Sequence, residues 1–246
     1  MPGSNKYLLR FKKILASKKI KLIIEGEKFI FSHQQKKIIY QIPPDLIVTQ
    51  AQKLSAIIQS KLQLNKKIFA RKCAVKKISK EEASDFLNLY HMMNSTQSAY
   101  NYALFLEDEL LAVCSFSKGR KMNRLPEHLR SFELIRFCCK EGYTIVGGLT
   151  KIIKTFCREK GVGDIMTYVD KQFSSGESFE KAGFILHGET GAHGFLINKK
   201  NFERSMIKIP TEKFFLLIKK PCAPVSPCKI NPAFSNDSPD ENCLST

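Results

Sequence analysis

Apolar residues recur with two different periods along the first third of the chain. Residues 6–18 place them at helical spacing opposite a lysine-rich face, and therefore predict an amphipathic helix. Three short β-rich runs follow, IKLIIEG, EKFIFS and KKIIYQI, and the turns between them predict a small meander. Pro43-Pro44 then interrupts the pattern. A helix is predicted from an N-cap at Thr49 through Leu64, with an apolar stripe of Leu54, Ile57, Ile58 and Leu62.

From Cys73 the pattern alternates between strands and helices. Strands are predicted at KCAVKKIS, AYNYALFLE, LLAVCSFSK, SFELIRFCC, DIMTYVD, GFILHG and GFLINK. The second and third of these are joined as a hairpin at Asp108-Glu109. A capping box at Ser79–Glu82 opens a helix, and LTKIIKTFCREK and SGESFEKAG predict two more. This order predicts an α/β (α+β) fold with a mixed β-sheet flanked by helices.

Four segments follow from these patterns. Residues 1–70 form a small basic α+β module, and residues 71–204 form the main domain. Residues 205–220 add either a strand or a helix, which the pattern leaves open. Residues 221–246 are rich in proline and serine without periodicity, and we expect a disordered tail because they bury too little apolar surface.

The net charge of +17 is concentrated at one end of the chain. Residues 1–80 hold 19 lysines and arginines against three acidic residues, whereas the remaining 166 residues carry a net charge of +1. A general bias toward lysine would not deplete acids from one third of the chain. We therefore expect a polyanion partner for the N-terminal module. Its candidate contacts to nucleic-acid phosphates are Arg10, Lys12, Lys13, Lys18, Lys19, Lys36 and Lys37.

Several classes of protein are not expected. No run of about 18 uncharged apolar residues is present to span a membrane, and the basic N-terminus lacks the apolar core of a secretory signal. The expected location is therefore the cytoplasm. The eight cysteines form no CxxC pair and the five histidines are scattered, so neither a disulfide framework nor a metal site is expected.

The stretch RFCCKEGYTIVGGLTKIIKTFC carries the clearest chemical signal. It predicts a strand, a glycine-containing turn and the start of a helix. Unpaired N–H groups and the positive helix end would face an anion there, and glycine would let the main chain come close. A pyrophosphate is the expected ligand. The residues predicted to bind it are Ile145, Val146, Gly147, Gly148 and Leu149.

Together with the residues that follow it, this stretch resembles the core of the GNAT (acyl-CoA N-acyltransferase) superfamily. The wording is closest to phage Mom-like DNA-modification and homing-endonuclease-associated domains, and FELIRF, VGGLTKIIK and TYVDKQFSSGESFEKAGF carry the resemblance over about residues 70–200. It implies a GNAT-like fold that binds acetyl-CoA or another acyl-CoA, with Ser178 as a further contact. It also implies modification of an amine, and the basic module favours an amine on a DNA base, reached in a flipped or single-stranded nucleotide.

Four residues are candidates for catalysis. Asp170 follows a buried strand, where it would act as a general base or cap the next helix. Arg136 lies in an apolar strand and requires a partner, either an acid (Glu133 or Asp170) or a ligand. His91 would act as a base near the substrate or as a helix C-cap. Tyr168 is a candidate acid, because Phe179 stands where many GNAT proteins have a tyrosine.

The loop at 119–129 is predicted to contact nucleic acid through Arg120, Lys121 and Arg124. Two other functions remain open. A non-catalytic nucleic-acid-binding protein on a GNAT scaffold would fit Phe179, and an ordinary N-acetyltransferase of protein or small-molecule amines would fit the fold. The acyl group, the acceptor atom and the oligomeric state are not determined by the sequence.

Overall fold

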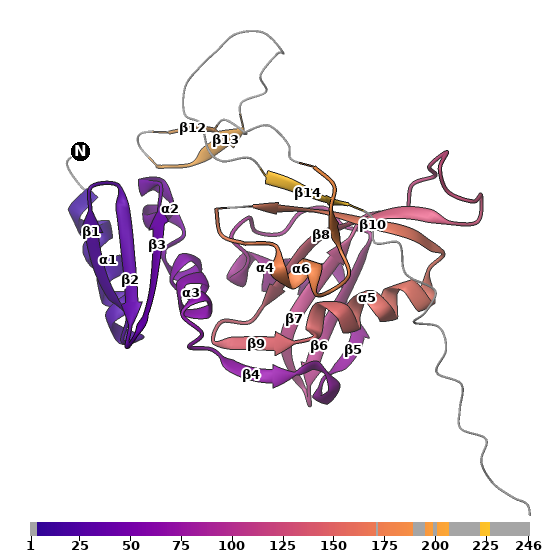
Figure 1. The fold of residues 1–246 in the computed structure, drawn as a ribbon, viewed down its shortest axis with the longest axis horizontal. Helices are drawn as coiled ribbons and strands as arrows, with labels where there is room; N and C mark the ends of the chain where they lie inside the picture. Colours follow the sequence, from indigo (N-terminus) through magenta and orange to yellow (C-terminus); the bar gives the residue numbers. More distant parts are fainter. Residues whose placement is uncertain (1–3, 171, 189–194, 199–200, 207–221, 227–246) are drawn as a thin grey trace, which may run out of the picture.

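The computed structural model describes residues 4–170, 172–188, 195–198, 201–206 and 222–226. Its N-terminal part is an α+β module beside the larger domain (Figure 1). The module consists of α1 (Ser4–Ser17), β1 (Lys21–Glu25), β2 (Lys28–His33), β3 (Lys36–Gln41), α2 (Pro44–Thr49) and α3 (Ala51–Lys61). The predicted helix and antiparallel meander are therefore present. One face of the meander packs on the helices in a core that includes Phe11, Leu15, Phe31, Leu54 and Ile58.

The prediction of a helix N-cap at Thr49 is wrong. Pro44 already starts α2, at the first helical position, where the missing N–H of proline costs nothing. Thr49 is the last residue of α2, and its Oγ1 donates to the carbonyl oxygen of Asp45 at 2.8 Å. Gln50 is the N-cap of α3 instead.

The larger domain is built on a seven-stranded sheet of order β11-β14-β10-β8-β7-β6-β5. Its elements are β5 (Ala74–Lys77), α4 (Lys80–Tyr90), β6 (Tyr100–Leu106), β7 (Glu109–Phe116), β8 (Arg130–Cys139), α5 (Gly148–Glu159), β10 (Val162–Asp170), α6 (Glu177–Glu180), β11 (Ile185–Leu186) and β14 (Cys222–Ser226). Strands β5 to β8 pair antiparallel and β8 pairs parallel with β10, so the predicted mixed sheet is confirmed.

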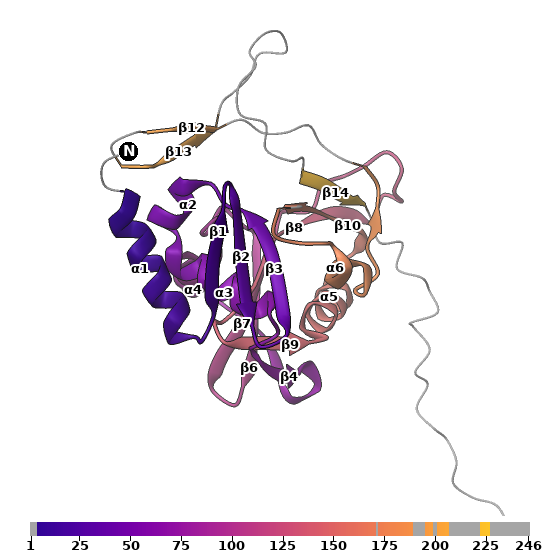
Figure 2. The same cartoon turned by 60° about the vertical axis from the view of Figure 1, so that its left-hand side comes forward.

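Helices cover both faces of this sheet, as Figure 2 shows for α4 and α5. Alternate residues of β6 point to opposite faces, so Leu104 packs with α5 and Ala103 packs with α4. On the α5 side, the rings of Phe116 and Phe156 stack at a centroid distance of 4.0 Å. The helix α4 starts with the predicted capping box, in which Ser79 and Glu82 bond each other's backbone N–H.

Two local predictions need correction. The residues before the glycine pair do not form only a turn, because β9 (Tyr143–Val146) pairs in parallel with β4 (Lys66–Phe69). The two strands lie far apart in sequence, so no local pattern indicates their pairing. The hairpin between β6 and β7 turns one residue earlier than predicted, at Glu107-Asp108, where Glu107 has a φ of +55°.

The C-terminal segments are described only in part. β12 (Phe195–Ile197) and β13 (Arg204–Met206) form a hairpin. Residues 222–226, at the start of the tail predicted to be disordered, form β14 and pair with β10. The remaining residues of the predicted segments 205–220 and 221–246 lie outside the described residues. No helix in the described part of the chain is long and apolar enough to cross a membrane.

Candidate functional site

The parallel strands β8 and β10 separate halfway along their length. Their pairing runs from Arg130 and Val162 to Glu133 and Met166, and the Oγ1 of Thr167 then donates to the carbonyl oxygen of Leu134 at 2.8 Å. No further residue pair joins the two strands, although both are described to their ends. The main-chain groups on the facing edges are therefore open to a ligand.

A β-bulge lies in β8 just where this separation begins. Phe116 of β7 pairs with Leu134 and Ser115 pairs with Arg136, which leaves Ile135 as an extra residue. The Nη1 of Arg136 donates to the carbonyl oxygen of Ile135 at 2.9 Å. A bulge of this kind bends a strand and redirects its side chains.

The predicted cofactor turn follows the C-terminal end of β8 along the chain, after β9. Gly147 is the N-cap of α5 with a φ of +75°, a conformation that favours glycine, and no side chain caps the helix. The first N–H groups of α5 have no acceptor within the helix. A Cβ on Gly148 would lie 2.9 Å from Leu104 Cδ1 and 3.0 Å from Ile145 Cγ2, so only glycine fits there without displacement.

The side chains of this turn are apolar and offer no hydrogen bond to an anion. Ile145 and Leu149 are buried, whereas Val146 is exposed. The Nζ of Lys151 donates to the carbonyl oxygens of Ala70 and Cys73, at 3.0 and 2.5 Å, and so anchors α5 to the segment after β4. Backbone amides and the helix dipole, rather than side chains, make this turn suitable for a pyrophosphate.

His91 and Arg136, both predicted as catalytic, lie close together. His91 is the C-cap residue of α4, and the Nε of Arg136 donates to the carbonyl oxygen of Asn94 at 3.3 Å. Burial first, and then the charges of Arg136 and Lys53, lower the pKa of His91 to about 4. Burial also lowers the pKa of Arg136, against the opposing effect of Glu133. His91 is thus neutral at pH 7. Its Nδ1 accepts the N–H of Met93 at 3.1 Å, so this nitrogen already holds a hydrogen bond within the loop after α4.

Asp170 and Tyr168 lie at the end of β10 and share one face of the strand. The Oδ1 of Asp170 accepts the N–H of Gln172 at 2.8 Å in a local turn. Asp170 does not cap the next helix as predicted, because the N-cap of α6 is Gly176 and no side chain caps that helix. Among the described residues, neither side chain is bonded to His91 or Arg136. Ser178 is exposed on α6, and Phe179 is half-buried with its ring against Phe184 at 5.8 Å.

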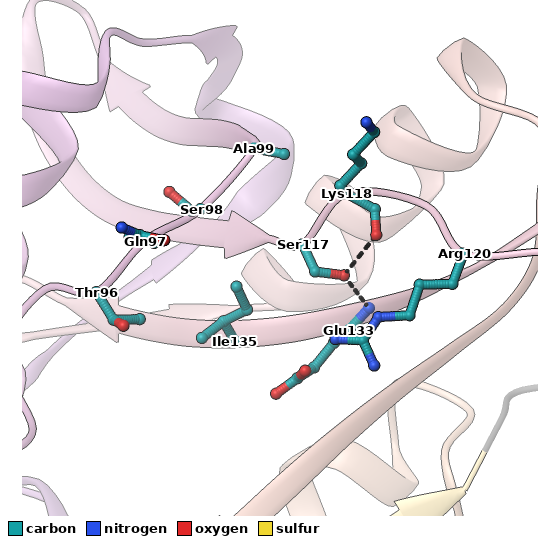
Figure 3. Close-up of a pocket in the computed structure, with 9 residues that line it drawn as sticks. All are labelled: Thr96, Gln97, Ser98, Ala99, Ser117, Lys118, Arg120, Glu133 and Ile135. Atoms are coloured by element: carbon teal, nitrogen blue, oxygen red, sulfur yellow. Dashed lines mark hydrogen bonds between the residues drawn. The ribbon is translucent and has the colours of Figure 1, made fainter.

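A surface pocket of about 440 Å³ opens at the bulge (Figure 3). It lies between the loop before β6, the end of β7 and β8. Its lining residues are Thr96, Gln97, Ser98, Ala99, Ser117, Lys118, Arg120, Glu133 and Ile135. The sequence predicts Glu133 only as an ion-pair partner of Arg136. A lone acid in an apolar strand was the signal that could have singled it out.

The three basic residues of the loop at 119–129 have different surroundings. Arg120 lines the pocket. Lys121 forms an exposed ion pair with Glu127 at 3.7 Å. Arg124 pairs at 2.5 Å with Asp164, a buried carboxylate that also accepts a hydrogen bond from Ser131. Arg120 is therefore the member of this set best placed to meet a ligand.

The N-terminal module contacts both flanks of the opening between β8 and β10. On one flank, the Nζ of Lys53 in α3 donates to the carbonyl oxygen of His91 at 2.9 Å and to Oδ1 of Asn94 at 2.5 Å. On the other, the Nε2 of Gln172 donates to the carbonyl oxygen of Gln41 at 2.7 Å. The module is thus part of the surroundings of the site.

The predicted phosphate-binding residues of the module fall into two groups. Lys18 is engaged by Glu141 and by the Oγ of Ser55, and Lys36 donates to Gln63. The others are exposed on α1, β3 and the turn after α1, namely Arg10, Lys12, Lys13, Lys19 and Lys37. These exposed residues keep their charges available to a polyanion.

No family model and no curated protein matches this chain. Solved structures of acetyltransferases are similar in fold. Naa50 of Arabidopsis thaliana, solved with the bisubstrate analogue CoA-Ac-MVNAL, shares 10% identity over 63% of this chain and 97% of its own, with a TM-score of 0.43. An acetyltransferase of Bacillus subtilis in complex with CoA shares 15% identity over the same proportions, with a TM-score of 0.41. A GNAT-family acetyltransferase of Streptococcus pneumoniae shares 11% identity over 62% of this chain and 97% of its own, with a TM-score of 0.38.

Proposed function

We propose that the larger domain binds an acyl-CoA in the opening between β8 and β10 and transfers the acyl group to an amine. The observation that carries this proposal is the early end of the pairing between these strands, beside a helix that starts without a side-chain cap. The open edge of β8 from Ile135 to Cys139 spans roughly 17 Å at about 3.4 Å per residue. That length is comparable to an extended pantetheine arm, whose amides bond well to an unpaired strand edge.

The residues of the turn fit the phosphate end of such a cofactor. Gly147 and Gly148 leave the main chain accessible, and the N–H groups of the first turn of α5 would hold the pyrophosphate. No arginine or glutamine precedes the glycines, so the affinity would rest on the backbone and the helix dipole. When bound, the cofactor would supply an activated thioester.

Glu133 is the best-placed group to receive the proton of an attacking amine. Its carboxylate forms no ion pair or hydrogen bond with any described residue, and it lies where β8 and β10 begin to separate. Asp170 is engaged in its own turn and the Nδ1 of His91 already accepts a hydrogen bond, so neither is equally free. The role of Arg136 is then to hold the loop of residues 91–94 beside Glu133.

We further propose that the acceptor amine belongs to a nucleic acid, with a DNA base as the favoured case. The support is the exposed basic surface of the N-terminal module together with the contacts that place this module at the opening. Nucleic acid bound there through its phosphates would lie beside the pocket. A base would have to leave its stack to reach Glu133.

Thermal unfolding with and without acetyl-CoA tests the cofactor. A ligand at 100 times its Kd stabilises a protein by about 2.7 kcal/mol, so the melting temperature should rise clearly. Gly148→Glu would place a carboxylate in the anion site and should abolish the shift. Gly163→Glu is a matched control, because its Cβ would be as crowded as that of Gly148, at 2.8 Å from Leu125 Cδ1, but lies away from the turn. The absence of any shift with several acyl-CoAs would contradict the proposal.

Mass spectrometry of nucleosides from cells that express the protein tests the acceptor. A new adduct should appear with the unaltered chain and disappear with Glu133→Gln, whereas Asp170→Ala should retain most of it. A second candidate function, nucleic-acid binding without transfer, is favoured by Phe179, whose ring packs against Phe184 and has no proton to donate. Binding of acyl-CoA without any adduct would favour that second function.

A further inference from the structure

The pocket at the bulge combines a carboxylate with a guanidinium that it does not pair with. Glu133 and Arg120 both line it, and neither forms an ion pair with any residue that the structure describes. Figure 3 shows Arg120 reaching back across β8 toward Glu133, while the ammonium group of Lys118 is turned away from it. Two opposite charges that line one pocket, each left without a partner among the described residues, suit a ligand that carries both an amine and an anion.

We infer that this pocket is the acceptor subsite of the proposed acyltransferase, and that it takes an amine bearing its own phosphate or carboxylate. The amine would donate to Glu133 and the anion would accept from Arg120. Calling the bound amine an acceptor rests on the proposed function. The prediction that the pocket binds an amine and an anion together rests only on the charges that line it.

The positions of both charged residues are held by their main chains. The N–H of Glu133 donates to Ser117 Oγ at 2.9 Å, and the N–H of Ser117 donates to the carbonyl oxygen of Glu133 at 2.9 Å. Arg120 and Ser131 exchange two backbone hydrogen bonds, each of 2.9 Å. The roots of the two side chains are therefore rigid, although their ends are free to meet a ligand.

The opposite wall of the pocket is supported by a buried polar cluster. Asn101 and Ser115 are 8% and 1% exposed, and the Oδ1 of Asn101 accepts from Ser115 at 2.7 Å and from Ser98 at 2.9 Å. These bonds tie the loop before β6 to the sheet. Thr96 and Gln97 of that loop then present further hydrogen-bonding groups to the pocket.

The size of the pocket suits a small ligand or one unit of a larger one. A volume of about 440 Å³ lies within the range of about 300–1,000 Å³ usual for small-molecule sites. One nucleotide fits such a volume, as does a small aminated phosphate or an amino acid. A carboxylate is a known partner of the exocyclic amine of cytosine, and thymine lacks such an amine. The shared chemistry of amine and anion is thus available from a nucleotide or from a free small amine.

Calorimetric titration of the full chain with matched probes tests this inference. One pair is deoxycytidine and deoxyuridine monophosphate, which differ only in that the exocyclic amine of cytosine is a carbonyl oxygen in uracil. The other series is O-phosphoethanolamine, ethanolamine and ethyl phosphate. At least one probe with both groups should bind ten times more tightly than its partners that lack either group. Binding in the first pair identifies a nucleotide as the source, and binding in the second identifies a small amine.

Variants assign the two contacts. Glu133→Gln should remove the preference for the amine, and Arg120→Ala should remove the preference for the anion. Glu127→Gln and Arg158→Ala change exposed charges outside the pocket and should leave both preferences intact. Equal binding of all probes, or discrimination that survives both pocket variants, would overturn the inference. Titration with CoA alone is measured in parallel, so that loss of the cofactor site and loss of the acceptor subsite are separate results.

Discussion

Replacement of Gly148 by alanine should weaken the cofactor site more than it weakens the fold. The added methyl group would lie 2.9 Å from Leu104 Cδ1 and 3.0 Å from Ile145 Cγ2, whereas ordinary contacts are 3.4–4 Å. Overpacking of this kind costs about 1–3 kcal/mol, against a gain of up to roughly 1 kcal/mol from the better helix propensity of alanine. We expect a net loss of about 1–2 kcal/mol in the free energy of unfolding.

The same displacement moves the N–H groups that would hold the pyrophosphate. A hydrogen bond to a charged group contributes about 1.5–3 kcal/mol, so the loss of one such bond should raise the Kd for CoA at least tenfold. Gly163→Ala is the matched control, because its Cβ would lie 2.8 Å from Leu125 Cδ1, away from the turn. Urea unfolding and calorimetry with CoA measure the two quantities. If Gly148→Ala and Gly163→Ala lose similar stability and bind CoA equally well, the anion site is not at this turn.

Three further predictions concern stability and coupling. The pKa of His91 is about 4 in the folded chain against 6.5 in the unfolded chain, so the unfolded chain binds more protons between these pH values. The free energy of unfolding should therefore be full above pH 6.5 and fall by up to roughly 3 kcal/mol as the pH drops toward 4. Urea midpoints measured over this pH range should show a smaller fall in His91→Gln. Arg124→Met leaves the buried carboxylate of Asp164 with Ser131 as its only hydrogen-bond partner and should lower the free energy of unfolding by about 2 kcal/mol. Adding Asp164→Asn to the same chain should restore part of this loss, and no recovery would mean that the two residues are not coupled. Lys53→Met removes two hydrogen bonds to the loop of residues 91–94 and should weaken acceptor binding while CoA affinity stays unchanged, and an equal loss of both would show a global effect.

The larger domain could be predicted from sequence because its signals are local. Two largely apolar runs on either side of an acidic turn mark β6 and β7, the capping box marks the start of α4, and a glycine before an amphipathic helix marks a turn with positive φ. The pairing of β4 with β9 could not be predicted, since each strand has four residues and the partner lies more than 70 positions away. The N-cap prediction at Thr49 was wrong because a threonine hydroxyl can also bond the carbonyl oxygen four residues earlier in the last turn of a helix, as it does here with Asp45.

The cofactor turn of the candidate site could be predicted from the sequence, but the opening between β8 and β10 could not. The glycines identify the turn by conformational need alone. The proximity of His91 and Arg136 depends on how a loop after α4 folds over a bulged strand, and no spacing rule contains that information. Glu133 stands beside the separation of β8 and β10, which depends on the sheet as a whole. Asp170 was singled out by its place after a strand, yet the same place lets it cap its own turn.

The basic third of the chain is not an independent arm, and this changes how its role must be tested. Deleting residues 1–70 would remove Lys53 and the whole of β4, which supports β9 beside the cofactor turn. Loss of any function after such a deletion would therefore not identify nucleic-acid binding.

Substitution of exposed lysines avoids this problem. Lys12, Lys13 and Lys37 are exposed and make no ion pair with a described residue, so their replacement by glutamine should leave the fold and CoA binding unaltered. If each contacts one phosphate of duplex DNA, the slope of log K against log salt should become less negative by about 0.9 per residue. Binding measured by fluorescence anisotropy from 50 to 200 mM salt gives that slope, and an unchanged slope in the triple variant would place the polyanion elsewhere. A reduced slope together with retained CoA affinity would mean that the phosphates lie on α1 and β3.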